Sequence, residues 1–226
     1  MSGFKDTKLN DILFFDIFDS IANIILVCSE KMCNDYIGLC KKIENHEEKI
    51  RNELYENYLD NDDVRTEVGF DSIPLRFIIE SPENYNLNSC TYSGRVDIKV
   101  VGKNWLTSDR KDYFIIECKR IDGSADLNKK FIENGVCRFV SEPILYPSYH
   151  KKNFMFGFVV KNIDVKGNAL LLNTLQNTDT KISVNEAFTE TECKINKAYT
   201  YVSKYFVKQG SIEIKHLFFN FSEVIT

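Results

Sequence analysis

Two short segments with the periodicity of β-strands, residues 94–100 and 113–120, constrain the fold of this chain more than any other feature. Apolar and charged residues alternate in the first segment, so Asp97 faces away from its apolar side, because successive side chains of a strand point to opposite faces. The second segment begins with an apolar run and then carries Glu117 and Lys119, which share a face. Both charged groups therefore project together from the end of a hydrophobic strand.

Pairing of these two strands would create a polar site. Neighbouring strands lie about 4.8 Å apart, so the carboxylates of Asp97 and Glu117 can converge, with Lys119 beside them. Charges at the end of a buried strand are costly unless they are paired or bind a metal. Two carboxylates and an ammonium group are typical of a site for a hard divalent cation and an activated water.

The tripeptide acid-x-Lys is uninformative by itself, because it recurs along the chain and residues 192–194 even repeat Glu-Cys-Lys. Its context is what differs. Glu192 follows a polar run, which indicates an exposed segment, and residues 211–217 have the pattern of an amphipathic strand with outward charges. Only Glu117 follows both a four-residue apolar run and a second strand that bears an acid.

Asp97 on one strand and Glu117-Cys118-Lys119 on the next resemble the motif of the PD-(D/E)XK, or restriction-endonuclease-like, nuclease superfamily. The resemblance covers residues 46–160, and the proline of the family's name is replaced by Val96. It implies that Asp97, Glu117 and the backbone carbonyl oxygen of Cys118 bind Mg²⁺, for which Mn²⁺ can substitute. Lys119 would orient the attacking water, help to deprotonate it and offset the charge of the phosphorane.

Members of this family usually carry another acid on a preceding helix. Residues 46–59 are predicted to form such a helix, with Asn45 as its N-cap,. Glu47 lies one turn before Ile50 on the inward stripe, whereas Glu48 lies off the stripe and has a capping-box role available. Glu47 is therefore the better catalytic candidate. Alternatively, both glutamates only favour a helix N-terminus, where negative charge is stabilised.

Candidate contacts to nucleic acid come from the region after the Glu-x-Lys strand. The predicted helix over residues 125–140 carries Lys130 and Arg138, and Arg120 follows Lys119 directly. In the family this helix lies beside the site and often offers polar groups to the phosphates, but ordinary surface charges explain these residues equally well. Trp105, in the connection over residues 102–111, could stack on a base or pack over the sheet.

The whole chain is expected to form one α/β domain, a mixed central β-sheet flanked by helices. Residues 9–40 form a predicted helix that is apolar on more than one side, which favours a place in the core over the docking of a partner,. Further strands are predicted at residues 65–70, 74–79, 153–160, 199–206 and 211–221, a loop at 81–89 and a helix at 169–176. Within the domain, residues 1–43 are a helical elaboration, 44–162 the restriction-endonuclease-like catalytic core, and 163–226 a C-terminal helix and β-hairpin.

Charge and cysteine content limit the partners and the compartment. The net charge of −4 and the isoelectric point near 5.5 are unusual for a protein that grips nucleic acid by overall charge,. A protein partner or a homodimer is therefore expected to supply specificity. Seven cysteines without a C-x-x-C pattern predict reduced thiols in a cytoplasmic protein,. No membrane span is expected, because acids interrupt the apolar stretch at residues 11–27,.

These features together predict a Mg²⁺-dependent nuclease that hydrolyses phosphodiester bonds in DNA, although nothing in the sequence excludes RNA. A small nuclease of this type resembles effectors of prokaryotic restriction or anti-phage systems. The alternative is a catalytically inactive nuclease-fold protein that serves as a binding or scaffold subunit. Because the acids should repel one another without metal, loss of Asp97 is not expected to lower the stability of the metal-free protein.

Overall fold

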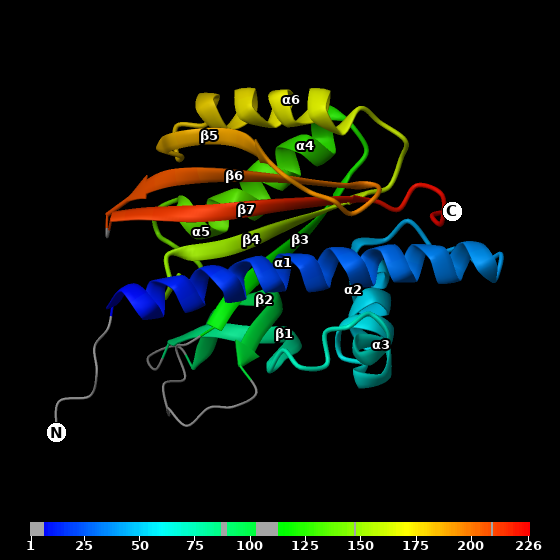
Figure 1. The fold of residues 1–226 in the computed structure, drawn as a ribbon. Coiled ribbons are helices and arrows are strands. Elements are labelled where there is room, and N and C mark those ends of the chain that lie inside the picture. The colour runs from blue at the N-terminus through cyan, green and yellow to red at the C-terminus, as the bar shows by residue number, and fades with distance from the viewer. Residues whose placement is uncertain (1–6, 87–89, 103–112, 147, 209) are drawn as a thin grey trace, which may run out of the picture.

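A seven-stranded mixed sheet runs through the middle of the protein, with helices on both sides of it (Figure 1). The computed structural model describes residues 7–86, 90–102, 113–146, 148–208 and 210–226. The predicted α/β class is confirmed. The strands are β1 (Leu75–Asn86), β2 (Thr91–Gly102), β3 (Tyr113–Ile121), β4 (Lys152–Val159), β5 (Val184–Thr191), β6 (Ala198–Val207) and β7 (Gly210–Asn220).

The centre of the sheet is parallel and its two sides are antiparallel. The strand order is β1-β2-β3-β4-β7-β6-β5, and β4 runs parallel to both β3 and β7. Nearly every residue of β3 and β4 is buried, as expected where both faces of a parallel strand are covered. The parallel crossover that was predicted to enter residues 153–160 is confirmed, and so is the final hairpin, β6 with β7.

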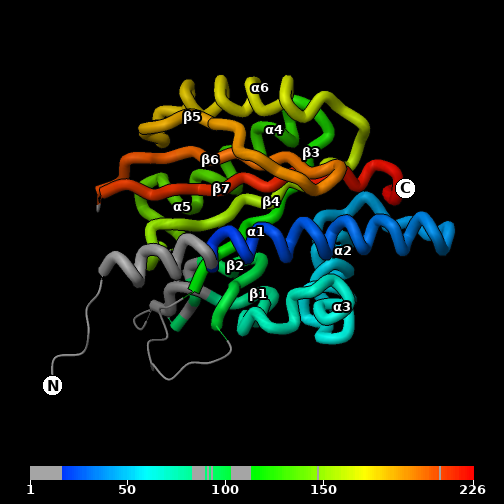
Figure 2. The backbone as a smooth tube through the Cα atoms, viewed as in Figure 1, coloured from blue at the N-terminus to red at the C-terminus, as the bar shows by residue number. Residues whose placement is uncertain are grey.

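Two helical layers cover the sheet (Figure 2). On one face lie α1 (Thr7–Gly38), α2 (Glu47–Leu54), the π-helical turn η1 (Tyr55–Leu59) and α3 (Asp62–Glu67). On the other lie α4 (Ala125–Phe131), the π-helical turn η2 (Ile132–Val136), α5 (Cys137–Val140) and α6 (Val165–Thr178). Each layer packs on its own apolar cluster.

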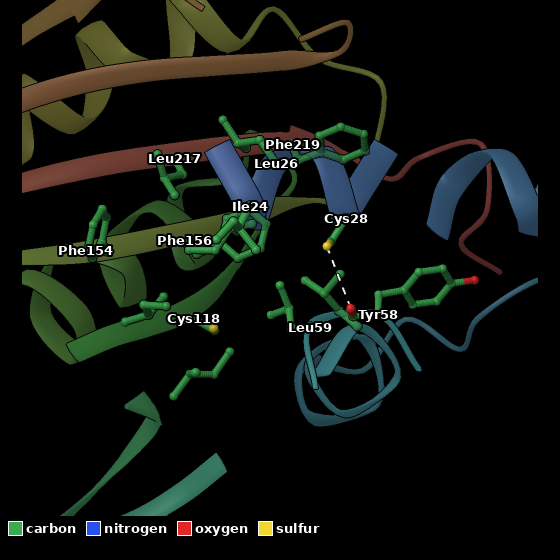
Figure 3. Close-up of a cluster of buried hydrophobic side chains, with 14 of the residues drawn as sticks. Ile24, Leu26, Cys28, Tyr58, Leu59, Cys118, Phe154, Phe156, Leu217 and Phe219 are labelled. Atoms are coloured by element: carbon green, nitrogen blue, oxygen red, sulfur yellow. Dashed lines mark hydrogen bonds between the residues drawn. The ribbon is translucent and has the colours of Figure 1, made fainter. Parts of the chain in front are cut away.

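The long helix α1 belongs to the core, as its apolar pattern predicted. Ile21, Ile24 and Ile25 are fully buried in the first cluster. Figure 3 shows part of this cluster, where residues of α1 meet Phe156 of β4 and Cys118 of β3.

The helix predicted over residues 125–140 is present as α4, η2 and α5 in succession. Ser124 caps its start by accepting a hydrogen bond from the Leu127 N–H. Gly135 lies in the π-helical turn, and a Cβ atom there would stand 2.4 Å from the Met155 methyl group. A glycine at this position therefore allows the helix to approach β4 closely.

Two of the predicted segments were wrong, and one strand was not predicted. The strand expected at residues 65–70 is instead α3 and a turn, because the Asn61 side chain caps the helix by accepting from the N–H groups of Asp63 and Val64. The loop expected at 81–89 is largely the continuation of β1 to Asn86. Strand β5 was not predicted, since it is an edge strand with mostly exposed, polar residues. Trp105 lies outside the described residues.

None of the seven cysteines forms a disulfide. Within the described ranges, no helix combines the length and the apolar composition that crossing a membrane requires.

Candidate functional site

The structure brings the four predicted catalytic side chains together around one ammonium group. Lys119 Nζ lies 2.7 Å from Glu117 Oε1, 3.1 Å from Glu47 Oε1 and 3.8 Å from Asp97 Oδ2. These residues come from α2, β2 and β3, which are separate in the sequence. The predicted convergence of Asp97 and Glu117 beside Lys119 is thus present in the fold.

The site forms where β2 and β3 cease to pair. The antiparallel register ends at the pair of Ile98 with Ile116, and Asp97 and Glu117 are the next residue of each strand. Beyond that pair, the Asp97 carboxylate replaces a main-chain acceptor, and its Oδ2 accepts a hydrogen bond of 2.8 Å from the Cys118 N–H.

Beyond the end of the ladder, Glu47 of α2 contacts Lys119 of β3 and Arg51 of α2 contacts Asp97 of β2. Asp97 thus pairs with a residue of α2 and Glu117 with Arg138 of α5, so the site lies where the two helical layers meet.

Glu47, not Glu48, is the helix residue that faces the site. Its two carboxylate oxygens accept from Lys119 Nζ and from the Arg120 N–H, each at 3.1 Å, while Glu48 is exposed. The predicted N-cap was wrong, because α2 begins at Glu47 and His46 is its N-cap residue. The carbonyl and side-chain oxygens of Asn45 instead accept from the Arg120 guanidinium, at 2.7 and 2.9 Å.

Glu117 is the most deeply buried acid of the site, with an exposed side-chain fraction of 0%. Its Oε1 contacts Lys119 and also Arg138 Nη1, at 2.9 Å. Its Oε2 is buried and has no hydrogen-bond partner among the described residues. Burial, followed by the repulsion of Asp97, raises the pKa of Glu117 to about 8, against the opposing effect of Lys119 and Arg138.

Lys119 remains charged in this environment. Burial by itself would lower the pKa of Lys119, but the carboxylates of Glu117, Asp97 and Glu47 outweigh burial and raise it. The ammonium group also donates a hydrogen bond of 2.6 Å to the Cys118 carbonyl oxygen. Lys119 is therefore a fixed positive charge surrounded by oxygen atoms.

Two further site residues, Arg51 and Glu80, were not predicted. Arg51 is buried, and its Nη1 lies 2.6 Å from Asp97 Oδ1 while its Nη2 lies 2.7 Å from Glu80 Oε1. Arg51 stands four residues after Glu47, so the helical period that puts both on one face was a usable signal. Glu80 is the first residue after the strand predicted at 74–79, and no sequence pattern singles it out. Its place in the site is evident only from its pairing with Arg51.

The candidate nucleic-acid contacts have partners within the protein. Arg138 points to Glu117 and to the hydroxyl of Tyr146, which in turn donates to the Arg95 carbonyl oxygen at 2.7 Å. Lys130 is exposed and pairs with Asp126 at 2.7 Å. The contacts of Lys130, Arg138 and Arg120 with phosphates remain predictions.

The donor set of the site suits a hard cation, although protein cations now contact part of it. Asp97, Glu117 and the Cys118 carbonyl offer only oxygen atoms, which Mg²⁺ prefers, and Glu117 Oε2 is a buried acceptor without a donor. Lys119, however, contacts Glu117 Oε1 and the Cys118 oxygen. Across the described residues, no three His, Cys, Asp or Glu side chains are grouped as they would be around a bound metal ion. A cation there requires Lys119 to withdraw from both oxygens.

The chain was compared with protein-family models, with curated proteins and with solved structures, and it matches none of them.

Proposed function

We propose that this protein is a Mg²⁺-dependent nuclease of the PD-(D/E)XK type that hydrolyses phosphodiester bonds in DNA. The observation that supports the proposal is the convergence of Glu47, Asp97 and Glu117 on the Lys119 ammonium group. A fully buried carboxylate with a strongly raised pKa, next to a second acid and a lysine, is a pattern that is enriched at catalytic sites,.

Asp97, Glu117 and the Cys118 carbonyl oxygen would hold the cation. Bound there, Mg²⁺ would polarise the scissile phosphate and lower the pKa of a bound water. Glu47 already contacts Lys119 at 3.1 Å, so it would retain the ammonium group after Lys119 leaves Glu117. Glu47 would thus act as the counter-ion of the lysine.

Lys119 would act as a positive charge and hydrogen-bond donor. Its raised pKa keeps the amine protonated near neutral pH, which argues against the expectation that it deprotonates the attacking water. After it leaves Glu117, the ammonium group would instead donate to the phosphate and stabilise the negative charge that develops in the transition state.

The biological setting of this activity is also part of the proposal. The net charge of −4 supports a protein partner or a second copy as the source of specificity on DNA. Seven cysteines without a disulfide support a cytoplasmic location. Action as an effector of a prokaryotic restriction or anti-phage system is proposed from the resemblance of the motif alone.

One observation favours the alternative of a catalytically inactive scaffold subunit. The buried acids already have cationic partners, Asp97 with Arg51 and Glu117 with Lys119 and Arg138. A balanced network of this kind can serve the stability of the fold alone, without any reaction. Removal of one partner would leave the other as an unpaired buried charge, which is strongly destabilising.

A cleavage assay separates the two proposals. Purified protein is incubated with plasmid DNA, single-stranded DNA and RNA in Mg²⁺, in Mn²⁺ or in chelator. The nuclease proposal expects metal-dependent cleavage that falls by at least about a hundredfold in Asp97→Asn and Lys119→Met. Glu192→Gln is the matched control, because it alters the exposed Glu-Cys-Lys repeat.

Three results would count against the proposal. Wild-type protein that cuts no nucleic acid with either metal would favour the scaffold. Cleavage that persists in chelator or in Lys119→Met would exclude this site as its source. Cleavage of RNA but not of DNA would support metal-dependent phosphodiester hydrolysis and contradict DNA as the substrate.

A further inference from the structure

Arg51 lies between two carboxylates that belong to different strands. Its Nη1 contacts Asp97 of β2 at 2.6 Å and its Nη2 contacts Glu80 of β1 at 2.7 Å. Only 3% of the residue is exposed. A guanidinium group is protonated at any pH that a folded protein tolerates, so this buried charge is permanent.

The surroundings of Arg51 hold both carboxylates in place. The second oxygen of Asp97 accepts from the Cys118 N–H, and the second oxygen of Glu80 contacts Arg95 Nη1 at 3.1 Å. Glu80 has a backbone φ of 53°, a left-handed conformation that is costly for a residue other than glycine,. A strained residue persists only where its neighbours fix it, and the side chain of Glu80 is held by Arg51 and Arg95.

We propose that Arg51 is a built-in cation of the site, which takes the position that a metal ion would otherwise hold between Asp97 and Glu80. As a positioning residue, it fixes the orientation of Asp97 and confines any divalent cation to the Glu117 side. The inference rests on the proposed function for the identity of that divalent cation, but the pairing of Arg51 with two acids does not depend on catalysis.

The physical consequence concerns what happens when the guanidinium is removed. Asp97 would keep Lys119 at 3.8 Å and Glu80 would keep Arg95 at 3.1 Å. The two carboxylates would nevertheless lose the cation that they share, and their repulsion would favour uptake of another cation. Oxygen atoms from two carboxylates are suitable ligands for a hard divalent ion. Arg51→Met keeps most of the side-chain volume and removes the charge, so it should convert this position into a metal site.

The test counts Mn²⁺ ions bound per protein by equilibrium dialysis. Arg51→Met should bind one more Mn²⁺ than the wild type, and the double variant Arg51→Met/Glu80→Gln should return to the wild-type number. The matched control is Arg65→Met. Arg65 is also buried, with 2% exposed, but its guanidinium donates to carbonyl oxygens, including those of Leu75 and Ile73. Arg65→Met should leave the number unchanged.

Thermal melts provide a second measurement. Arg51→Met should be destabilised in chelator and should recover with Mn²⁺ more than the wild type does, whereas Arg65→Met should lose stability without that recovery. An Arg51→Met protein that binds the wild-type number of ions would overturn the proposal. So would a variant that stays unfolded in saturating Mn²⁺, because a divalent ion would then not replace the guanidinium.

These outcomes are distinguishable from failure of the nuclease proposal. A wild type that binds no Mn²⁺ and cuts no nucleic acid would refute the proposed function. If Arg51→Met nevertheless gained one ion, the role of Arg51 as a built-in cation would stand.

Discussion

The burial of Glu117 predicts that the stability of this protein falls as the pH rises towards the alkaline range. The pKa of Glu117 is raised from its ordinary value of 4.5 to about 8, because of burial and then of the neighbouring Asp97. Between these values the unfolded chain has released the proton while the folded protein still binds it. The stabilisation that the folded state gains from binding this proton is therefore lost as the pH rises from 4.5 to about 8. It is fully present only below pH 4.5,.

The size of the effect follows from the same two values. Each pH unit inside the window lowers the free energy of unfolding by about 1.4 kcal/mol, to a total on the order of 5 kcal/mol. Glu117→Gln mimics the protonated carboxyl and cannot ionise. The stability of this variant relative to the wild type should therefore increase by about 3 kcal/mol between pH 5.5 and pH 8.

Urea denaturation at a series of pH values, in chelator, measures this difference. Lys119 and Arg138 are the cations that face Glu117, and Asp97 is the neighbouring acid; none of them is altered in Glu117→Gln, so their own contributions largely cancel. Bound Mg²⁺ would favour the ionised carboxylate, and saturating Mg²⁺ should flatten the wild-type profile. If the wild type and Glu117→Gln keep a constant difference from pH 5.5 to pH 8, the raised pKa is wrong and the two cations dominate.

Two further predictions concern stability without metal. Asp97→Ala should lower the free energy of unfolding by about 2–3 kcal/mol, because buried Arg51 loses one of its two carboxylates and the Cys118 N–H loses its acceptor,. Urea denaturation measures the difference. A variant as stable as the wild type, or more stable, would support the expectation made from the sequence, that loss of this acid only relieves repulsion. Gly157→Ala should lower the free energy of unfolding by about 1–3 kcal/mol, because the added Cβ would lie 2.4 Å from the Phe218 ring. Thermal melts check the second prediction against Gly38→Ala, where a Cβ would have no neighbour within 4 Å, and an unchanged midpoint for Gly157→Ala would contradict it.

The strand and helix periods in the sequence were sufficient to place the four central residues. The alternation around Asp97 and the apolar run before Glu117 predicted that both acids approach Lys119, and the contacts of its ammonium group agree. The stripe of the second helix predicted that Glu47 faces inward. These inferences succeeded because side-chain direction along a regular element depends only on its period. The expected common apolar face of Val96, Ile98 and Val100 was wrong, because Val96 packs in the second apolar cluster and the other two in the first.

Elements whose form depends on distant contacts were not predictable in the same way. Arg65 lies in a segment with strand-like residues, yet it belongs to α3, and its guanidinium is buried against carbonyl oxygens of residues 70–75. Strand β5 has few apolar residues, because it pairs only with β6 and is mostly exposed. Composition cannot identify a strand whose stability comes from its neighbour's hydrogen bonds.

The sequence by itself determined the class of the fold, the two faces of β3 and the group of Glu47, Asp97, Glu117 and Lys119. Only the tertiary structure decided how their charges are balanced. The pairing of Asp97 with Arg51 joins residues 46 positions apart, and that of Glu117 with Arg138 depends on how the helix after β3 packs on the sheet. Such pairings depend on burial and on distances of a few ångströms between separate elements, which no local pattern of residues encodes.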